Sequence, residues 1–145
     1  MTFRFETLLK LRKNAENLEQ REMAEIQNHL YARKNELQDL TSSGEKSKEE
    51  LQTRLEQSIP GRTLELYDRY LQSTGTRSVL QEKIILETGE KVEAKRSELV
   101  ESMRRRRVLE ILKDREILKK KSKAHKDEIA LIDESASIRW QMRNL

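Results

Sequence analysis

The side chains best suited to chemistry are four consecutive arginines, Arg104–Arg107, followed by a series of lysines. Guanidinium and ammonium groups at this density bind anions, which include phosphates, lipid head groups and acidic protein surfaces. Residues 101–145 hold 13 basic and 8 acidic side chains, a balance of +5, while the whole chain carries +4. We therefore predict that this region attracts an anionic partner through a basic patch, defined as Arg104, Arg105, Arg106, Arg107, Lys119, Lys120 and Lys121.

Three interpretations of the basic patch remain open. The plainest is a solvated helix face whose cations pair with neighbouring acids. A site for an acidic protein surface is the second, and a site for nucleic acid is the third. Proteins that read nucleic acid usually show a groove-entering helix or interleaved aromatic residues that stack on bases. No aromatic residue lies between residues 102 and 126, so a protein partner is favoured and nucleic acid is not expected.

Catalytic and metal-binding patterns are missing from the sequence. It contains no cysteine and two histidines, His29 and His125. It has no glycine-rich phosphate loop, no paired-histidine zinc motif and no nucleophile elbow. Acidic residues are many, but they spread along the chain as solvated helix faces do. We predict that the protein is not an enzyme and uses no cofactor or metal ion.

The composition indicates how such residues are positioned. Charged residues make up 39 % of the chain and apolar residues 34 %, with one proline and four glycines. This combination is typical of long helices that share a narrow apolar seam. No run of about 18 apolar residues could cross a membrane, and the first residues lack the apolar core of a secretory signal. We therefore expect a cytoplasmic protein.

Apolar residues recur at spacings of three and four, the pattern of a coiled-coil seam. The first series skips across Glu22, which indicates a stutter. Its members are Leu8, Leu11, Ala15, Leu18, Ile26, Leu30, Leu37, Leu40, Leu51 and Leu55. The second series has another phase shift before Val108 and consists of Val92, Leu99, Met103, Val108, Ile111, Arg115, Leu118, Ser122, His125, Ile129, Ile132, Ala136 and Arg139.

The fold predicted from these two series is all-α, a long antiparallel two-helix coiled-coil hairpin with a short helical tip segment. Pro60 and Gly61 end the first helix, because proline disfavours helix at the residue before it. We place the first helix at residues 3–58 and the second at 78–141, within a single coiled-coil domain over 1–145. The tip, 59–77, holds a short helix that ends at Gly75.

A register for the hairpin follows from matching the two series. Leu11 faces Ala136, and Ala15 faces Ile132, so a large side chain meets a small one in each layer. In the same register Leu18 faces Ile129 and Glu22 faces His125. The two chain ends are then expected to lie together.

The six aromatic residues mark both ends of this hairpin. Phe3, Phe5 and Trp140 fall near the joined chain ends, while Tyr67 and Tyr70 fall in the tip. Tyr31 lies partway along the first helix. Thin coiled coils have little core for aromatic rings, so these residues either dock partners or cap the ends by local packing.

The sequence resembles the FliJ family of flagellar export proteins. The similarity begins with "FRFETLLKLRKNAENLEQREMAEIQ" and returns in "VLEILKDREILKKKSKAHKDEIALIDESASIRW". The family's Leu-Glu-x-Leu-Lys-x-Arg pattern appears at Leu109–Arg115, and its terminal Leu-Asp-Glu-x-Ala-x-x-Arg pattern appears at Ile132–Arg139. The family's usual tyrosine is missing from residues 117–121.

This resemblance implies a non-enzymatic component of the flagellar type III protein export apparatus. Such proteins form the central stalk of the hexameric export ATPase, as in rotary ATPases, contact the cytoplasmic domain of the membrane export gate, and escort export chaperones. The implied location is cytoplasmic and peripheral at the inner-membrane export apparatus. Ring contacts would be Phe3, Phe5, Arg12, Asp133, Glu134, Arg139 and Trp140. Gate contacts would be Tyr31, Leu64, Tyr67, Tyr70 and Leu71, with the basic patch facing acidic protein surface.

Two other functions stay open at this point. One is the equivalent stalk of a virulence injectisome. The other is a basic coiled coil that binds nucleic acid or an anionic membrane surface, which would show salt-dependent binding to DNA or lipid vesicles.

Overall fold

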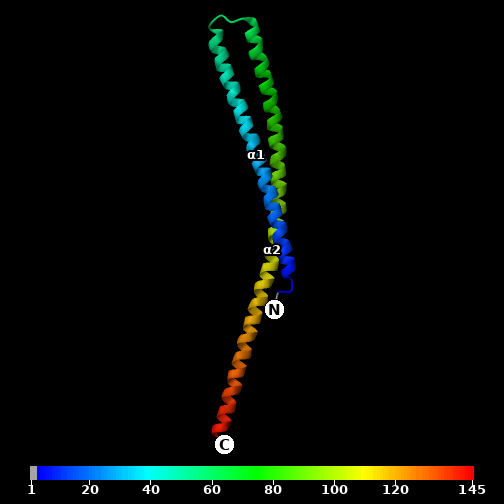
Figure 1. Ribbon diagram of the computed structural model, residues 1–145, viewed down its shortest axis with the longest axis vertical. Coiled ribbons are helices and arrows are strands. Elements are labelled where there is room, and N and C mark those ends of the chain that lie inside the picture. The colour runs from blue at the N-terminus through cyan, green and yellow to red at the C-terminus, as the bar shows by residue number, and fades with distance from the viewer. Residues whose placement is uncertain (1–2) are drawn as a thin grey trace. The chain divides into compact units, whose positions relative to one another are not determined.

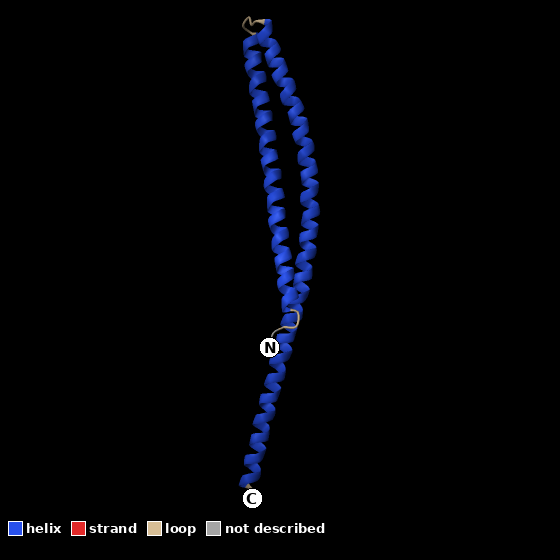
Figure 2. Ribbon diagram, turned by 45° about the vertical axis from the view of Figure 1, so that its right-hand side comes forward, coloured by secondary structure: helices blue, strands red, loops and turns tan. Residues whose placement is uncertain are grey.

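The structure, a computed structural model that describes residues 3–145, consists of two long helices (Figure 1, Figure 2). Helix α1 is Glu6–Leu55 and helix α2 is Gly61–Arg143. No strand occurs between residues 3 and 145. The all-α helical hairpin predicted from the sequence is confirmed.

A short turn, residues 56–60, joins the two helices. The amide of Gln57 donates to the carbonyl of Arg54 at 3.0 Å, which closes the last turn of α1. The carbonyl of Pro60 accepts from Thr63 at 3.0 Å and from Leu64 at 3.3 Å. Because proline has no amide proton and a fixed φ, it fits the start of a helix, where amide protons lack partners anyway.

The predicted tip is not a separate segment, because α2 runs without a break through Gly75. A glycine inside a helix costs only about 1 kcal/mol relative to alanine, and burial of the α2 face that holds Thr74 and Ser78 offsets this cost. The hydroxyls of Thr76 and Ser78 donate to the carbonyls of Gln72 and Thr74 at 3.0 and 2.9 Å, so they stay within the helical pattern. The boundary proposed at residue 78 is therefore wrong.

The chain divides into two compact units. Unit 2 is residues 17–99, and it contains the turn. Its two helical arms run antiparallel and are half-buried or buried along one narrow line each. On α1 this line is Glu19, Met23, Ile26, Leu30, Arg33, Leu37, Leu40, Gly44, Ser47 and Leu51. On α2 it is Thr63, Tyr67, Leu71, Thr74, Ser78, Gln81, Ile85, Thr88, Val92, Lys95 and Leu99.

Polar residues occupy many positions in the unit 2 seam. Thr74, Gln81 and Thr88 are buried, with 5–8 % of their surface exposed, alongside the apolar Met23 and Val92. Spacings of three and four are kept throughout, so this is a heptad seam in which small and polar side chains replace many of the usual leucines. Such a seam holds the helices together with less apolar burial than a leucine zipper.

Unit 1 consists of residues 1–16 and 100–145, of which 3–16 and 100–145 are described. The start of α1 packs on α2 through Leu9 and Leu109, which are 2 % and 8 % exposed. Glu16 is buried in the same contact and forms an ion pair with Arg106. Lys113 binds Glu6 at 2.9 Å.

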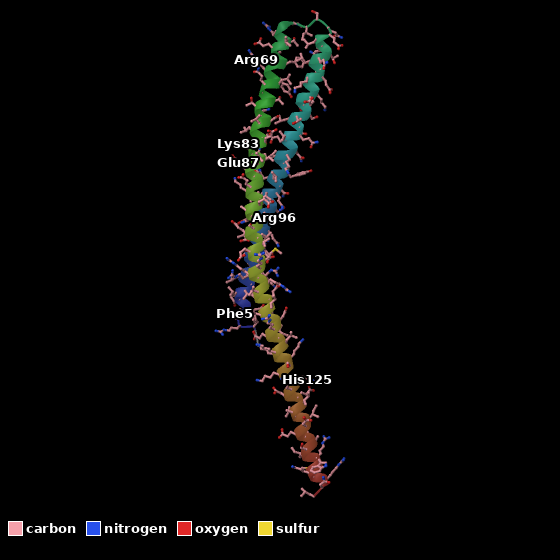
Figure 3. All side chains as sticks on the ribbon, turned by 180° about the vertical axis from the view of Figure 1, so that it is seen from behind. Phe5, Arg69, Lys83, Glu87, Arg96 and His125 are labelled. Carbon is pink, nitrogen blue, oxygen red and sulfur yellow. The ribbon has the colours of Figure 1, made fainter. Side chains whose placement is uncertain are left out.

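Beyond Glu116, α2 continues through unit 1 as a single helix. Every residue from 117 to 145 is exposed, and only Ile117 and Lys120 at the start of this stretch border the described groove that Phe3 lines. This part of α2 is the orange and red segment in Figure 1, and His125 is labelled on it in Figure 3. We call residues 117–145 the free helix.

The seam predicted in unit 1 lies on the wrong face of both helices. Leu11 of α1 is 59 % exposed and Val108 of α2 is 57 % exposed. Leu8, Ala15, Ile111 and Arg115 are exposed as well. The buried line follows Leu9, Arg12 and Glu16 on α1, and Ser102, Arg106, Leu109, Lys113 and Glu116 on α2. A pattern of apolar residues does not indicate this line, because charged side chains hold five of its eight positions.

The predicted stutter at Glu22 and the predicted register are also wrong. In unit 2 the buried line passes from Glu19 to Met23 without a shift, and Glu22 pairs with Lys95, not with His125. In unit 1, Leu11 and Ala136 are both exposed. A heptad repeat looks the same after each shift of seven residues, so the position of the turn decides the register.

Candidate functional site

The aromatic cluster at the start of the chain lies beside the middle of α2. Phe3 and Phe5 meet edge to face, with ring centroids 5.7 Å apart, and Arg4 lies 5.5 Å from the Phe5 ring. Phe3 lines a shallow groove together with Lys113, Ile117 and others, and Figure 3 shows Phe5 at this level of unit 1. Arg12 is half-buried about two turns beyond Phe5 on α1.

The other predicted ring contacts lie far along the free helix. Asp133, Glu134, Arg139 and Trp140 are all exposed. Ile117 and Trp140 are about 35 Å apart at the rise of an α-helix, about 1.5 Å per residue. The structure therefore does not bring the two groups together, and the prediction that the chain ends meet is wrong.

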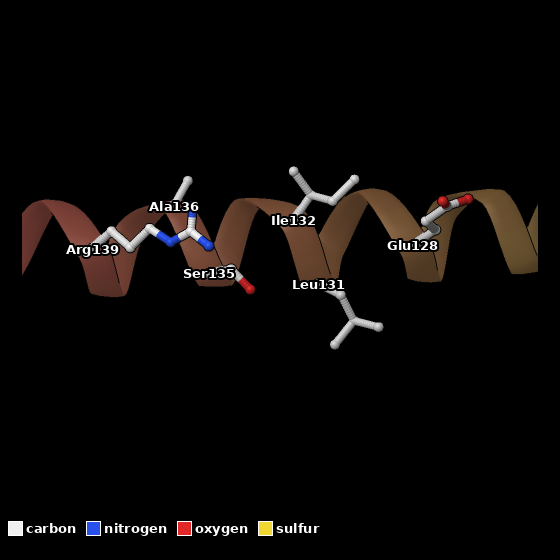
Figure 4. Close-up of a pocket in the computed structure, with 6 residues that line it drawn as sticks. All are labelled: Glu128, Leu131, Ile132, Ser135, Ala136 and Arg139. Atoms are coloured by element: carbon white, nitrogen blue, oxygen red, sulfur yellow. The ribbon is translucent and has the colours of Figure 1, made fainter.

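The free helix carries a hollow on its surface near these residues (Figure 4). It is lined by Glu128, Leu131, Ile132, Ser135, Ala136 and Arg139, all on α2. A hollow made by one helix is open to water and cannot enclose a substrate. It offers small and apolar side chains to another helix or a protein surface.

Most arginines of the basic patch are paired within the chain. Arg106 donates to Glu16 of α1 and to Glu110 of α2, the second contact at 2.6 Å. Arg107 binds Glu110 at 3.2 Å, and Arg105 binds Glu101 at 3.2 Å.

The free cations of the patch are therefore fewer than the sequence indicates. Lys120 binds Glu116 at 2.8 Å. Within residues 3–145, no salt bridge is found for Arg104, Lys119 or Lys121. Pairing with nearby acids, the plainest interpretation, describes four of the seven cations, and three remain for an anionic partner.

The ion pairs of unit 1 change the proton affinities of their members. The hydrogen bond from Lys113 holds the pKa of the Glu6 carboxyl below 4.5. The hydrogen bonds from Arg106, and secondarily from Arg107, hold the pKa of Glu110 below 4.5. Hydrogen bonds to Glu16 and Glu110 raise the pKa of Arg106. Each shift favours the charged form, so these pairs are structural contacts between α1 and α2 and within α2.

The predicted gate residues near the turn have two different surroundings. Tyr67 is half-buried, and Arg54 lies 5.7 Å from the centre of its ring. Burial, and then a hydrogen bond with Glu50, raise the pKa of the Tyr67 phenol. Leu64 and Tyr70 are 42 % and 46 % exposed, so they are available to a partner while Tyr67 holds the two helices together.

Tyr31 does not join this group. It lies on α1 and is 68 % exposed. About 35 Å of helix separates it from Arg54, which contacts Tyr67. Leu71 belongs to the buried line of unit 2 and is half-buried. The turn-proximal surface is therefore Leu64 and Tyr70, with the exposed Leu66 in the same two turns.

Sequence reasoning missed the residues that join the two helices. A pattern of apolar residues does not select Glu6, Glu16 and Lys113, because they are charged, yet they fall on positions spaced by three and four with the buried leucines. Alternating acids on α1 and bases on α2 along those positions was the signal that could have found them.

The described part of the chain shows no metal centre. Between residues 3 and 145, no group of three or more histidine, aspartate or glutamate side chains is placed to hold an ion. Neither described helix contains a stretch that is long and apolar enough to cross a membrane.

Comparison with known protein families identifies the family of this chain. The sequence matches the family described as "Flagellar FliJ protein" over residues 1–145. The chain belongs to the FliJ family. FliJ-family proteins are associated with flagellar protein export, so the resemblance predicted from the two terminal motifs is confirmed. Comparison with curated proteins finds no match, and neither does comparison with solved structures.

Proposed function

We propose that this FliJ-family chain is the central stalk of the hexameric flagellar export ATPase and has no catalytic activity of its own. The observation that carries the proposal is the free helix, residues 117–145, exposed on all sides. A single helix about 10–12 Å wide suits the narrow channel of a ring of subunits. Its apolar stripe is exposed to solvent in the isolated chain and would become buried inside the channel of the ring.

The ring contacts we propose on the free helix are Asp133, Glu134, Arg139 and Trp140. Trp140 is 69 % exposed, and exposed tryptophans and arginines supply much of the binding energy in protein interfaces. Phe3, Phe5 and Arg12 would form a second contact, about 35 Å back along α2. The two contacts would therefore meet different levels of the ATPase.

The turn-proximal surface is the proposed contact for the cytoplasmic domain of the membrane export gate. Leu64 and Tyr70 are the exposed members, Tyr67 and Leu71 support them from the seam, and Tyr31 would touch the gate separately. In this arrangement one chain bridges the ATPase and the gate. Escort of export chaperones is part of the same proposal, as is a cytoplasmic, peripheral position at the inner-membrane export apparatus.

The basic patch fits a protein partner better than nucleic acid. Arg106 is turned toward Glu16 and Glu110, so it is unavailable to phosphates. The cations left over lie on a helix without stacking aromatic residues between 102 and 126. These features support contact with an acidic protein surface.

Two alternatives are tested by simple observations. An injectisome stalk would require secretion genes beside this one in place of flagellar genes, and the family match favours the flagellar system. A nucleic-acid or membrane binder would retain DNA or anionic vesicles at physiological salt.

The decisive experiment measures ATP hydrolysis by the partner ATPase with and without this chain. We expect the chain to raise hydrolysis while hydrolysing no ATP alone. The double variant Arg139→Ala/Trp140→Ala should lose most of the stimulation. Met142→Ala is the matched control, because Met142 is 71 % exposed in the same turns and has no assigned contact. Full stimulation by the double variant would contradict the proposed ring contact.

A further inference from the structure

The free helix has an unpartnered apolar stripe that matches half of a coiled coil. Its members repeat at spacings of three and four, and all are exposed. They are the apolar Leu118, Ile129, Ile132 and Ala136, with the polar Ser122 and His125 between them. Burial of leucine and isoleucine side chains favours a helical partner on this face.

Charge along the same stretch is divided into two blocks. Residues 119–126 contain five lysines and no acid, while residues 127–134 contain four acids and no base. A partner helix must therefore offer acids opposite the first block and bases opposite the second. A second copy of this helix running antiparallel has that order, whereas a parallel copy would set like charges against each other.

We propose that two copies of the chain pair antiparallel through residues 118–136, centred at Asp127. In this register Leu118 faces Ala136 of the second copy, and Ser122 faces Ile132. His125 faces Ile129, and each layer occurs twice. The flanking Lys119 then lies beside Asp133 of the second copy on both sides of the centre.

Neighbouring registers are excluded by charge. If the register is shifted by one heptad toward the N-terminus, its centre falls between residues 123 and 124. The lysine block of one copy then faces the lysine block of the other. A shift the other way sets the acidic block against itself. The pairing ends at Leu118 and Ala136, because the next layer would join Arg115 to Arg139.

We expect the affinity between the two copies to be low. Its core has few large apolar side chains, and at the centre Lys126 meets its own copy while Glu128 meets its own copy. Interfaces this narrow fall at the low end of the size range for specific complexes. The dimer therefore forms and separates readily with protein concentration.

Single introduced cysteines test the orientation and the register, since the chain has no cysteine. Lys126→Cys meets its copy at the centre and should be joined by a short bismaleimide crosslinker into a covalent dimer. Lys120→Cys and Ala136→Cys are the controls, because the copies of these residues are about 21 and 27 Å apart along the axis. A covalent dimer from either control, or none from Lys126→Cys, would overturn the proposal.

A charge exchange tests the pairing without crosslinks. Lys119→Glu and Asp133→Lys each place like charges at the flanking contact, so each should weaken self-association about tenfold in sedimentation equilibrium. An equimolar mixture restores both contacts and should associate as the unmodified chain does. Unchanged helical circular dichroism verifies folding. A mixture no stronger than the separate variants, or an unmodified chain that stays monomeric at millimolar concentration, refutes the proposal. ATPase stimulation is a separate readout, so this result does not depend on the stalk role.

Discussion

Arg106 of α2 and Glu16 of α1 form an ion pair across the two helices although 90 positions separate them in the sequence. The Glu16 side chain is 8 % exposed and the Arg106 side chain 24 % exposed. Arg106 also binds Glu110, one turn away on α2. A charge removed from water at this level is stabilised by its partner, and it becomes costly when the partner is lost.

The substitution Arg106→Met should therefore lower the free energy of unfolding by about 2–3 kcal/mol. Loss of the guanidinium removes an interhelical partner of the buried Glu16 carboxylate. The measurement is urea unfolding followed by circular dichroism. Arg105→Met is the matched control, because its pair with Glu101 is exposed and its effect should stay within about 0.5 kcal/mol. Equal losses from both variants would show that the interhelical pair is not special.

Acid should loosen unit 1 before it loosens unit 2. The carboxyls of Glu6 and Glu110 have pKa values below 4.5 in the folded chain. Unfolded, they bind protons at higher pH, so their stabilisation is fully present above about pH 4.5 and is lost as pH falls through the folded pKa. Hydrogen exchange of α2 amides near residue 110 should rise first. The double variant Glu6→Gln/Glu110→Gln should lose this pH dependence.

Alkali should act on unit 2 instead. A hydrogen bond with Glu22 raises the pKa of Lys95 above 10.5, and burial raises that of Tyr67 above 10. Their stabilisation is present below these values and is lost as pH rises through the folded pKa. Amide exchange near Lys95 should therefore increase in strong alkali. Lys95→Met should be less stable at neutral pH and should show a flatter alkaline limb.

The sequence was enough to predict two long helices and their antiparallel pairing, but not which faces meet. In unit 2, Ile26, Leu30, Leu37, Leu40 and Leu51 were placed correctly on the seam, because apolar residues mark it there. In unit 1 the seam positions hold Glu16, Arg106 and Lys113, and apolar residues on the solvent faces misled the search. Which face of a helix is buried depends on its contacts with the other helix, and the residue pattern of one helix alone does not contain that information.

The register failed for a related reason. The predicted register matches the two series alone, with a helix end at Gly75, and it sets Glu22 against His125. The helix passes Gly75 because one glycine costs only about 1 kcal/mol relative to alanine and the flanking Thr74 and Ser78 are held in the seam. With the turn at residues 56–60, Glu22 meets Lys95. Of the candidate site, exposure of Leu64, Tyr70 and Trp140 was predictable, whereas the separation of Phe3 from Trp140 was not.

The substitution Gly44→Ala should raise the free energy of unfolding by about 0.5–1 kcal/mol. Gly44 is buried inside α1, and an added methyl group would lie 3.5 Å from Thr74, an ordinary contact. Alanine also improves helix propensity. Gly75→Ala is the control for propensity alone, because nothing lies within 4 Å of its added methyl group. Gly44→Ile should destabilise by overpacking. Thermal unfolding ranks the stabilities of the three variants. If Gly44→Ala lowers the stability, the added methyl group does not fit beside Thr74 as expected.

The gate contact predicts a separable defect. Leu64→Ala/Tyr70→Ala should weaken binding to the cytoplasmic domain of the export gate about tenfold or more, since exposed aromatic and apolar residues anchor interfaces. ATPase stimulation should be unchanged. Val79→Ala is the control, because Val79 is 66 % exposed further along α2 and has no assigned contact. Binding is measured by titration calorimetry. Equal binding by the unmodified chain, the double variant and the control would show that the export gate does not contact this surface.

The antiparallel dimer and the ATPase ring would use the same face of the free helix, so they should exclude each other. The bismaleimide-joined dimer of Lys126→Cys should fail to stimulate ATP hydrolysis, because its apolar stripe from Leu118 to Ala136 is covered. The same variant capped with N-ethylmaleimide remains free to separate and should stimulate as the unmodified chain does. Both samples carry a modified cysteine at one position, so the comparison isolates pairing. Full stimulation by the joined dimer would place the ring contact elsewhere, while the crosslink itself would still establish the dimer.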